Sequence, residues 1–295
     1  MPRFGRVASP MVTPFDDDLR LDLDAAVSFA RWLVDEQAND GLVVCGTTGE
    51  SPTLDDAERL DLIRAVSEAV TVPVVAGTTS NDTAHSVELT RQAEACGAAG
   101  VLAVTPYYNR PSQAGLEAHF RAVAGATTLP VMLYDIPVRT GRKVDGDVLL
   151  RLAREGENIV AVKDSAGDLA ATARLVADAP GGFEVYCGED KLNLPSLAVG
   201  AVGLVGVAGQ WAGPLLLELV TAHEKGDVEA ARALNGRLLD SYAFESGDDA
   251  PNPVPAKAIL RALGQPVGRT RPPMGPDPAW LEDRARDVLA GLGPR

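Results

Sequence analysis

Residues 158–167 read NIVAVKDSAG, an apolar run that ends in a lysine. The run shows no alternation of polar and apolar residues, and this is typical of a strand that is covered on both faces. Lysine is scarce in this chain and occurs only at positions 143, 163, 191, 225 and 257. One of these few lysines, Lys163, therefore stands at the end of a predicted buried strand.

Seven further apolar runs of the same kind lie on either side of this one. They are residues 7–12, 41–45, 72–77, 100–106, 130–135, 183–188 and 201–207. Helical patterns fall between them; Ala26, Phe29 and Leu33, for example, share one helix face. Eight strands, each followed by a helix, predict an α/β fold of the closed (β/α)8 TIM-barrel type. The alternative is an open doubly wound sheet, which would need a glycine-rich turn that MVTPFDDDL (11–19) does not offer.

The strand patterns stop after residue 225. Residues 227–243, 255–264 and 278–291 predict helices, and the loop SGDDAPNPVP joins the first two. We therefore predict a catalytic barrel over residues 1–225 and a C-terminal helical subdomain over residues 226–295. Earlier in the chain, Thr53 followed by Asp56 predicts a helix start of the capping-box type.

Composition limits the classes of function. The formal net charge of -14 repels nucleic-acid phosphates and anionic lipids, so we expect neither as a partner. Nor does any stretch of about 18 apolar residues predict a membrane span. The three cysteines and three histidines are scattered, which predicts free buried thiols and no metal site. The N-terminal residues lack the apolar core of a secretory signal, so we expect a cytoplasmic protein.

The catalytic groups of such a barrel come from the carboxyl ends of its strands. Lys163 occupies one of these ends. Burial disfavours the charged form of an amine, and a neutral amine attacks carbonyl groups to form a Schiff base. Two structural roles remain as alternatives: an ion pair with Asp164, or a side chain that reaches solvent.

Other strand ends carry polar groups suited to the same chemistry. GTTGES (46–51) offers two hydroxyls and open backbone N–H groups for a small carboxylate. Tyr134 could move protons for a Schiff base, and Arg139 could clamp a second carboxylate. Each also has a structural alternative: an ordinary turn, a core aromatic and a surface arginine; Tyr107 and Tyr108 could form a subunit contact. These residues predict a lysine-dependent aldolase or condensing lyase that acts on a small, unphosphorylated keto acid.

Five motifs in order and at similar spacing resemble the dihydrodipicolinate synthase family. This family belongs to the N-acetylneuraminate lyase superfamily of Schiff-base barrels. The motifs are GTTGES, TPYYNRP (105–111), YDIPVRTG (134–141), the lysine of AVKD (161–164) and PNPVPAK (251–257). GTTGE and YxIP are common to the superfamily, whereas the arginine of YDIPVRTG, TPYYNRP and PNPVPAK are more typical of the synthases.

The resemblance implies the catalytic residues. Lys163 would form the imine with pyruvate, and Tyr134 would donate and accept protons. Thr47 would link Tyr134 to Tyr108 in a proton relay, and Tyr108 would come from the other subunit of a tight dimer.

It also implies the substrate-binding residues and the reaction. Thr48 and backbone groups near Val205 would bind the pyruvate carboxylate, and Gly188 would line the pocket. Arg139 would receive the carboxylate of L-aspartate 4-semialdehyde. The condensation of these two substrates is the first committed step toward diaminopimelate and lysine. It needs no cofactor or metal, and the family is usually a cytoplasmic homotetramer, a dimer of dimers.

Two further points concern specificity and regulation. Members of the family that lysine inhibits bind it with residues that include two histidines and a glutamate. Here the corresponding positions resemble Asp56, Arg59 and His85. Loss of the glutamate removes an anionic partner for the lysine ammonium, so we expect weak or no inhibition by lysine.

The alternative functions are those of a related N-acetylneuraminate lyase or keto-sugar-acid aldolase, and of a non-catalytic barrel with a binding or regulatory role.

Overall fold

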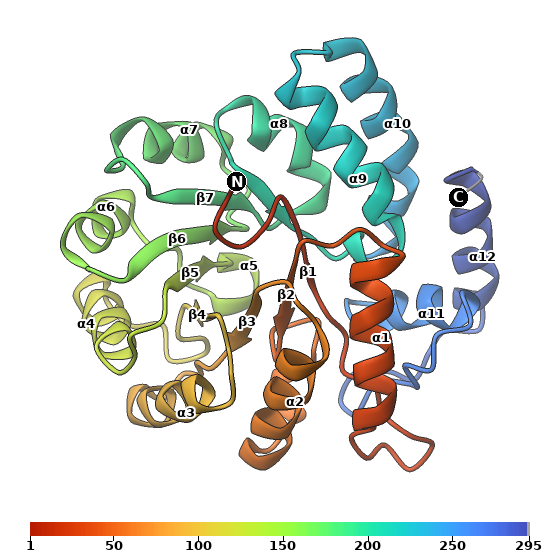
Figure 1. Ribbon diagram of the computed structural model, residues 1–295, viewed down its shortest axis with the longest axis horizontal. Helices are drawn as coiled ribbons and strands as arrows, with labels where there is room; N and C mark the ends of the chain where they lie inside the picture. Colours follow the sequence, from red (N-terminus) through yellow and green to blue (C-terminus); the bar gives the residue numbers. More distant parts are fainter. Residues whose placement is uncertain (294–295) are drawn as a thin grey trace.

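The computed structural model describes residues 1–293, and its eight strands close into a parallel barrel in chain order (Figure 1). The strands are β1 (Val7–Pro10), β2 (Gly41–Val44), β3 (Val74–Gly77), β4 (Gly100–Val104), β5 (Val131–Asp135), β6 (Ile159–Asp164), β7 (Glu184–Cys187) and β8 (Gly203–Val205). The barrel closes because β8 pairs with β1. The predicted TIM barrel is therefore confirmed, and the open sheet is wrong.

Helices surround the barrel and continue beyond it toward the C-terminus (Figure 1). They are α1 (Leu23–Asp35), α2 (Asp56–Ala69), α3 (Thr83–Ala95), α4 (Gln113–Ala124), α5 (Pro137–Thr140), α6 (Gly146–Glu155), α7 (Leu169–Asp178), α8 (Asn193–Ala198), α9 (Gly209–Glu224), α10 (Val228–Phe244), α11 (Val254–Ala262) and α12 (Leu281–Gly291). The three predicted C-terminal helices correspond to α10, α11 and α12. None of the helices in the described part of the chain is both long and apolar enough to span a membrane.

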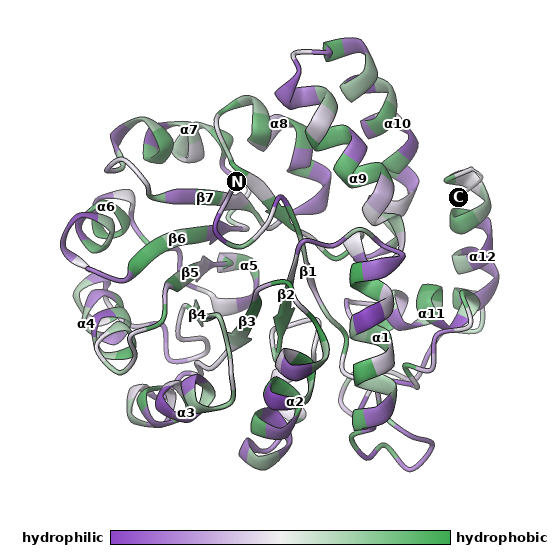
Figure 2. Ribbon diagram, viewed as in Figure 1, coloured by the Kyte–Doolittle hydropathy of each residue, from purple (hydrophilic) through white to green (hydrophobic). Residues whose placement is uncertain are grey.

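The continuous apolar runs form strands because both of their faces are buried. In β6, Val162 packs in the cluster that also holds helix residues of α4 and α6, whereas Ala161 packs in the cluster inside the barrel. Figure 2 shows the same arrangement as green strands within helices that carry purple positions. Successive side chains of a strand point to opposite faces. Lys163, two residues after Ala161, therefore points toward the barrel interior.

The predicted start of α2 at Thr53 is wrong. Thr53 ends a short 3-10 turn (Ser51–Thr53), and Asp55 is the residue that caps the helix. The Asp55 carboxylate accepts from the Glu58 N–H at 2.8 Å, and Glu58 accepts from the Asp55 N–H at 3.2 Å. A glutamate reaches back to the cap more readily than Asp56 could, so the reciprocal pair forms two positions further along.

The C-terminal helices pack on the barrel through a shared core. Phe15 of the barrel, Leu238 of α10 and Ile259 of α11 belong to one cluster of buried apolar residues. Trp211 of α9 donates to the Ser241 hydroxyl of α10 at 2.8 Å. A division of the chain at residue 225 stays a prediction, and it separates residues that share this core.

Candidate active site

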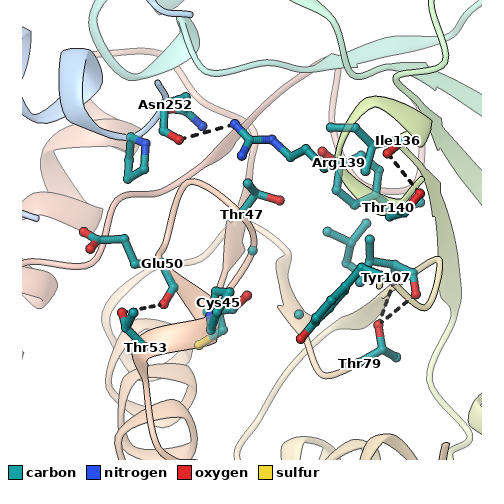
Figure 3. Close-up of a pocket in the computed structure, with 18 of the residues that line it drawn as sticks. Cys45, Thr47, Glu50, Thr53, Thr79, Tyr107, Ile136, Arg139, Thr140 and Asn252 are labelled. Atoms are coloured by element: carbon teal, nitrogen blue, oxygen red, sulfur yellow. Dashed lines mark hydrogen bonds between the residues drawn. The ribbon is translucent and has the colours of Figure 1, made fainter. Parts of the chain in front are cut away.

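A cavity of about 390 Å³ opens at the carboxyl ends of the strands. Its lining comes from the segments after β2, β4 and β5 and from C-terminal residues such as Asn252 and Met274 (Figure 3). Four predicted site residues line it: Thr47, Tyr108, Tyr134 and Arg139. The other four are not part of the lining: Thr48, Lys163, Gly188 and Val205.

Lys163 lies one layer deeper than the cavity wall, in contact with a residue that forms this wall. It pairs in register with Tyr134 of β5 on one side and Tyr186 of β7 on the other. Its side chain is 5% exposed, and its Nζ lies 4.4 Å from the centre of the Tyr134 ring. Burial contradicts the alternative in which this lysine reaches solvent.

The neighbouring carboxylate of Asp164 bonds to other donors. Its Oδ1 accepts from the Ala166 N–H at 2.9 Å, and its Oδ2 accepts from the Thr172 hydroxyl at 2.6 Å. Among residues 1–293, no ion pair joins it to Lys163. The ion-pair alternative for Lys163 is therefore wrong as well, and the amine keeps its place beside Tyr134.

Gly188 leaves space for the lysine side chain. A Cβ at this position would lie 2.7 Å from the Lys163 Cγ and 2.8 Å from its Cε, and it would also clash with the Ser165 hydroxyl. Both distances to Lys163 are shorter than real Cβ contacts. The absence of a side chain at the end of β7 thus permits the observed path of Lys163.

Thr48 and Arg139 are joined through one residue of the C-terminal segment. The Asn252 side-chain amide donates to the Thr48 hydroxyl at 3.0 Å, and Arg139 donates to the Asn252 carbonyl at 3.3 Å. Figure 3 shows Arg139 reaching across the cavity toward Asn252, with Thr47 beside its path. A guanidinium carries five N–H donors, so this single bond leaves donors for a carboxylate.

The three members of the predicted proton relay share the cavity but are not bonded to each other. None of the hydrogen bonds found within residues 1–293 joins the hydroxyls of Thr47, Tyr134 and Tyr108. Tyr108 has a left-handed backbone with φ 72° and is 89% exposed. Its side chain therefore lies at the mouth of the cavity, where a second subunit could bury it.

Val205 ends β8 and is fully buried. The turn after it is held by Asp190, whose Oδ2 accepts from the Val207 N–H at 2.5 Å and from the Ala208 N–H at 3.3 Å. Burial raises the pKa of Asp190, and burial together with Asp190 raises that of Glu245 well above its usual value. Asp190 thereby fixes the backbone beside the predicted carboxylate site.

Sequence reasoning missed the second buried lysine, Lys257. Its Nζ lies 2.9 Å from Glu50 Oε1, and both side chains are buried. Asn252, which lies five residues before it, was also missed as a partner of Thr48. Both residues belong to PNPVPAK, a motif that carried the resemblance without a stated role. Among the described residues, no group of three or more His, Cys, Asp or Glu side chains could hold a metal ion.

A closed parallel barrel with a cavity at the carboxyl ends of its strands defines the class: a (β/α)8-barrel protein with its site where the enzymes of this fold carry theirs. Comparison with known proteins gives the family. The model of the dihydrodipicolinate synthetase family matches residues 3–289. The chain therefore belongs to the dihydrodipicolinate synthetase family.

Individual relatives agree with this assignment. The 4-hydroxy-tetrahydrodipicolinate synthase of Moorella thermoacetica is 49% identical over 274 residues, which cover 92% of each chain. That of Acidothermus cellulolyticus is 49% identical and covers 98% of this chain and 93% of its own. Among solved structures, dihydrodipicolinate synthase DapA-2 of Bacillus anthracis superposes over 100% of both chains with a TM-score of 0.94 at 39% identity. The chain is a lyase with the 4-hydroxy-tetrahydrodipicolinate synthase activity of this family.

Proposed function

We propose that this enzyme condenses pyruvate with L-aspartate 4-semialdehyde through a Schiff base on Lys163. The observation that carries this proposal is the position of the Lys163 amine, buried at the end of β6 and 4.4 Å from the Tyr134 ring centre. An amine kept from water attacks the pyruvate carbonyl, and loss of water gives an imine. The imine nitrogen then accepts the electrons that a bound cofactor would otherwise accept.

Proton transfer is assigned to the residues around the amine. Tyr134 donates a proton to the departing hydroxyl and removes one from the methyl carbon, which gives the enamine. Thr47 and Tyr108 carry protons between Tyr134 and solvent. The enamine carbon attacks the aldehyde, and the amine of the second substrate displaces Lys163 and closes the ring.

Carboxylate binding orients the two substrates. Thr48 and the backbone at the end of β8, near Val205, hold the carboxylate of pyruvate. Arg139 holds the carboxylate of the aldehyde. Its guanidinium lines the cavity, and its bond to Asn252 leaves other N–H donors for a carboxylate. Gly188 gives Lys163 the space to reach the bound keto acid.

The assembly and the compartment are also proposals. We infer a homotetramer made of two tight dimers, in which Tyr108 enters the cavity of the neighbouring subunit. The exposed Tyr108 and Val138 beside the cavity mouth support this contact. A cytoplasmic location agrees with the three buried free cysteines, because thiols persist in a reducing compartment.

Two assays test the proposed function. Turnover of pyruvate with L-aspartate 4-semialdehyde is followed by coupling to the reductase that consumes the product and NADPH. Borohydride reduction with pyruvate, followed by peptide mass spectrometry, should place a pyruvate adduct on Lys163. If pyruvate is trapped on Lys163 but no turnover occurs, the Schiff base is supported and the proposed second substrate is wrong. If no pyruvate is trapped, the proposed role of Lys163 is wrong.

A further inference from the structure

Glu50 ends the GTTGE part of the loop after β2 and has an unusual backbone. Its φ of 56° lies in the left-handed region, which a residue with a side chain adopts only when its surroundings hold it there. Its N–H donates to the Thr47 carbonyl at 3.1 Å, and its carbonyl accepts from the Thr53 N–H at 3.0 Å. The conformation of Glu50 thus closes the turn that presents Thr47 and Thr48.

Glu50 is part of the cavity lining, but its carboxylate turns away from the reacting groups. Figure 3 shows it directed away from Thr47 and Arg139. Its Oε1 lies 2.9 Å from the Nζ of Lys257, and its Oε2 accepts from the Arg271 N–H at 2.8 Å. Both partners belong to the C-terminal segment, more than 200 residues from Glu50 in the sequence.

Lys257 is as buried as Glu50; the two side chains are 0% and 1% exposed. Its Nζ donates to the Arg269 carbonyl at 2.8 Å and lies 4.2 Å from the centre of the Phe15 ring. Burial lowers the pKa of Lys257 to about 8, although the Glu50 carboxylate acts in the opposite direction. The amine is held by the Glu50 carboxylate and by a backbone carbonyl, and it does not line the cavity.

The same C-terminal segment also reaches the carboxylate-binding residues. Asn252 donates to the Thr48 hydroxyl, and its carbonyl accepts from Arg139. Arg271 pairs with Glu58 at the start of α2 at 2.6 Å and donates to the Thr53 carbonyl at 2.7 Å. The loop after β2 is therefore held from the outside by residues of the C-terminal part of the chain.

We propose that the buried Glu50–Lys257 ion pair is a positioning device for pyruvate binding, because it fixes the turn that carries Thr47 and Thr48. The two residues act through the turn and not on the substrate. This inference rests on the proposed function and assigns a role to PNPVPAK. Loss of the pair displaces the Thr48 hydroxyl and weakens the hold on the pyruvate carboxylate. Arg139 keeps its position on α5, so binding of the aldehyde is spared.

The experiment compares two variants with the wild-type enzyme. The double variant Glu50→Gln with Lys257→Met removes both charges together, which leaves no unpaired charge in the core. Glu50→Asp retains both charges and shortens the reach by one methylene. We expect each to raise the pyruvate KM and the half-saturation of borohydride trapping about tenfold or more. The KM for the aldehyde should stay within about twofold of the wild-type value.

The split between the two KM values separates positioning from a purely structural role. Partial unfolding reduces the fraction of active enzyme and hence the apparent kcat, but it leaves the KM of the folded molecules unchanged. Lys225→Met is the matched control, since this exposed lysine ends α9 away from the cavity and should change neither KM.

A wild-type pyruvate KM in a folded double variant overturns the inference. If the double variant does not fold, Glu50→Asp decides the question by the same criterion. Failure of the proposed function is a different result, because it would show in the wild-type enzyme as an absence of trapping and turnover.

Discussion

Lys163 and Lys257 are both buried, but their surroundings differ. Lys257 is paired with Glu50 and bonded to a backbone carbonyl, whereas the Lys163 amine packs against the ring of Tyr134, which lines the cavity. The Glu50 carboxylate favours the charged form of the Lys257 amine, although burial lowers its pKa overall, and the bonds of this amine point away from the cavity. Because the Lys163 amine contacts a residue of the cavity wall, we propose Lys163 as the nucleophile.

Lys163→Ala should abolish the pyruvate adduct and lower kcat by roughly three orders of magnitude or more, because no other amine replaces the imine nitrogen. Borohydride trapping and the coupled assay measure the two effects, and circular dichroism should show an intact fold. An adduct that still formed on the variant, for example at Lys257, would refute the assignment.

Arg139→Ala should raise the KM for L-aspartate 4-semialdehyde about tenfold to a hundredfold, the range expected for a lost charge-assisted hydrogen bond. Pyruvate trapping should keep its wild-type half-saturation, because the proposed role of Arg139 concerns the other substrate. Steady-state kinetics with each substrate varied in turn gives both values. Equal damage to the two substrates would argue against a carboxylate clamp.

At the scale of elements, the ends of β5 and β6 bring two carboxylates together. Asp135 pairs in register with Asp164. Burial raises the pKa of Asp135 to about 6, while Lys143, 3.6 Å away, and the Val144 N–H act in the opposite direction. The folded state therefore holds a proton that the unfolded state releases at lower pH.

Asp135→Asn removes this titration and keeps the acceptor for Val144. Between about pH 4 and 6 the folded wild-type protein binds more protons than the unfolded chain, so its unfolding free energy falls as pH rises. The variant should gain stability relative to wild type over this range, by about 1.4 kcal/mol for each unit of pKa difference. Urea unfolding of both proteins at pH 4.5 and 7.5 measures it; a stability difference independent of pH would contradict the raised pKa.

At the scale of the whole molecule, the cavity of one chain carries an exposed tyrosine at its mouth. Tyr108 shares the cavity with Tyr134, yet no hydrogen bond within residues 1–293 connects them. We therefore expect that a relay including Tyr108 is completed by a second subunit.

Mixing two inactive variants tests this arrangement. In a dimer of one Lys163→Ala and one Tyr108→Phe subunit, one site receives an intact Lys163 and the partner's intact tyrosine. Random pairing of equal amounts should restore activity to roughly a quarter of the wild-type sites. The mixture is dissociated, reassociated and assayed, with each variant alone as the control. A relay within one subunit predicts no recovery.

The residues expected to control inhibition by lysine lie beside the loop after β2. The His85 Nε2 lies 2.9 Å from the Asp56 carboxylate, and the Arg59 guanidinium is turned inward to donate to the Ser51 carbonyl at 2.5 Å. These groups leave no glutamate for a lysine ammonium at the position of His85, so we expect little inhibition by sub-millimolar lysine. The double variant Asp56→His with His85→Glu should increase the inhibition, and strong inhibition of the wild-type enzyme would contradict the expectation.

The sequence by itself determined the barrel and the place of Lys163 at a strand end. Eight apolar runs predict strands because parallel strands are buried on both faces, and Lys163, Tyr134 and Gly188 follow from their places at strand ends. Local pattern failed at α2, where Asp55 and Glu58 cap the helix in place of Thr53. The helix type was right but its start was misplaced, because several neighbouring residues can serve as the N-cap.

Only the tertiary structure decided how the C-terminal segment enters the site. Glu50 and Lys257 are 207 positions apart, and Thr48 and Asn252 are 204 apart. No periodicity or local propensity links residues at such distances. Their contacts arise because α11 shares a buried core with residues of the loop after β1 such as Phe15, and burial of both charges makes each the necessary partner of the other.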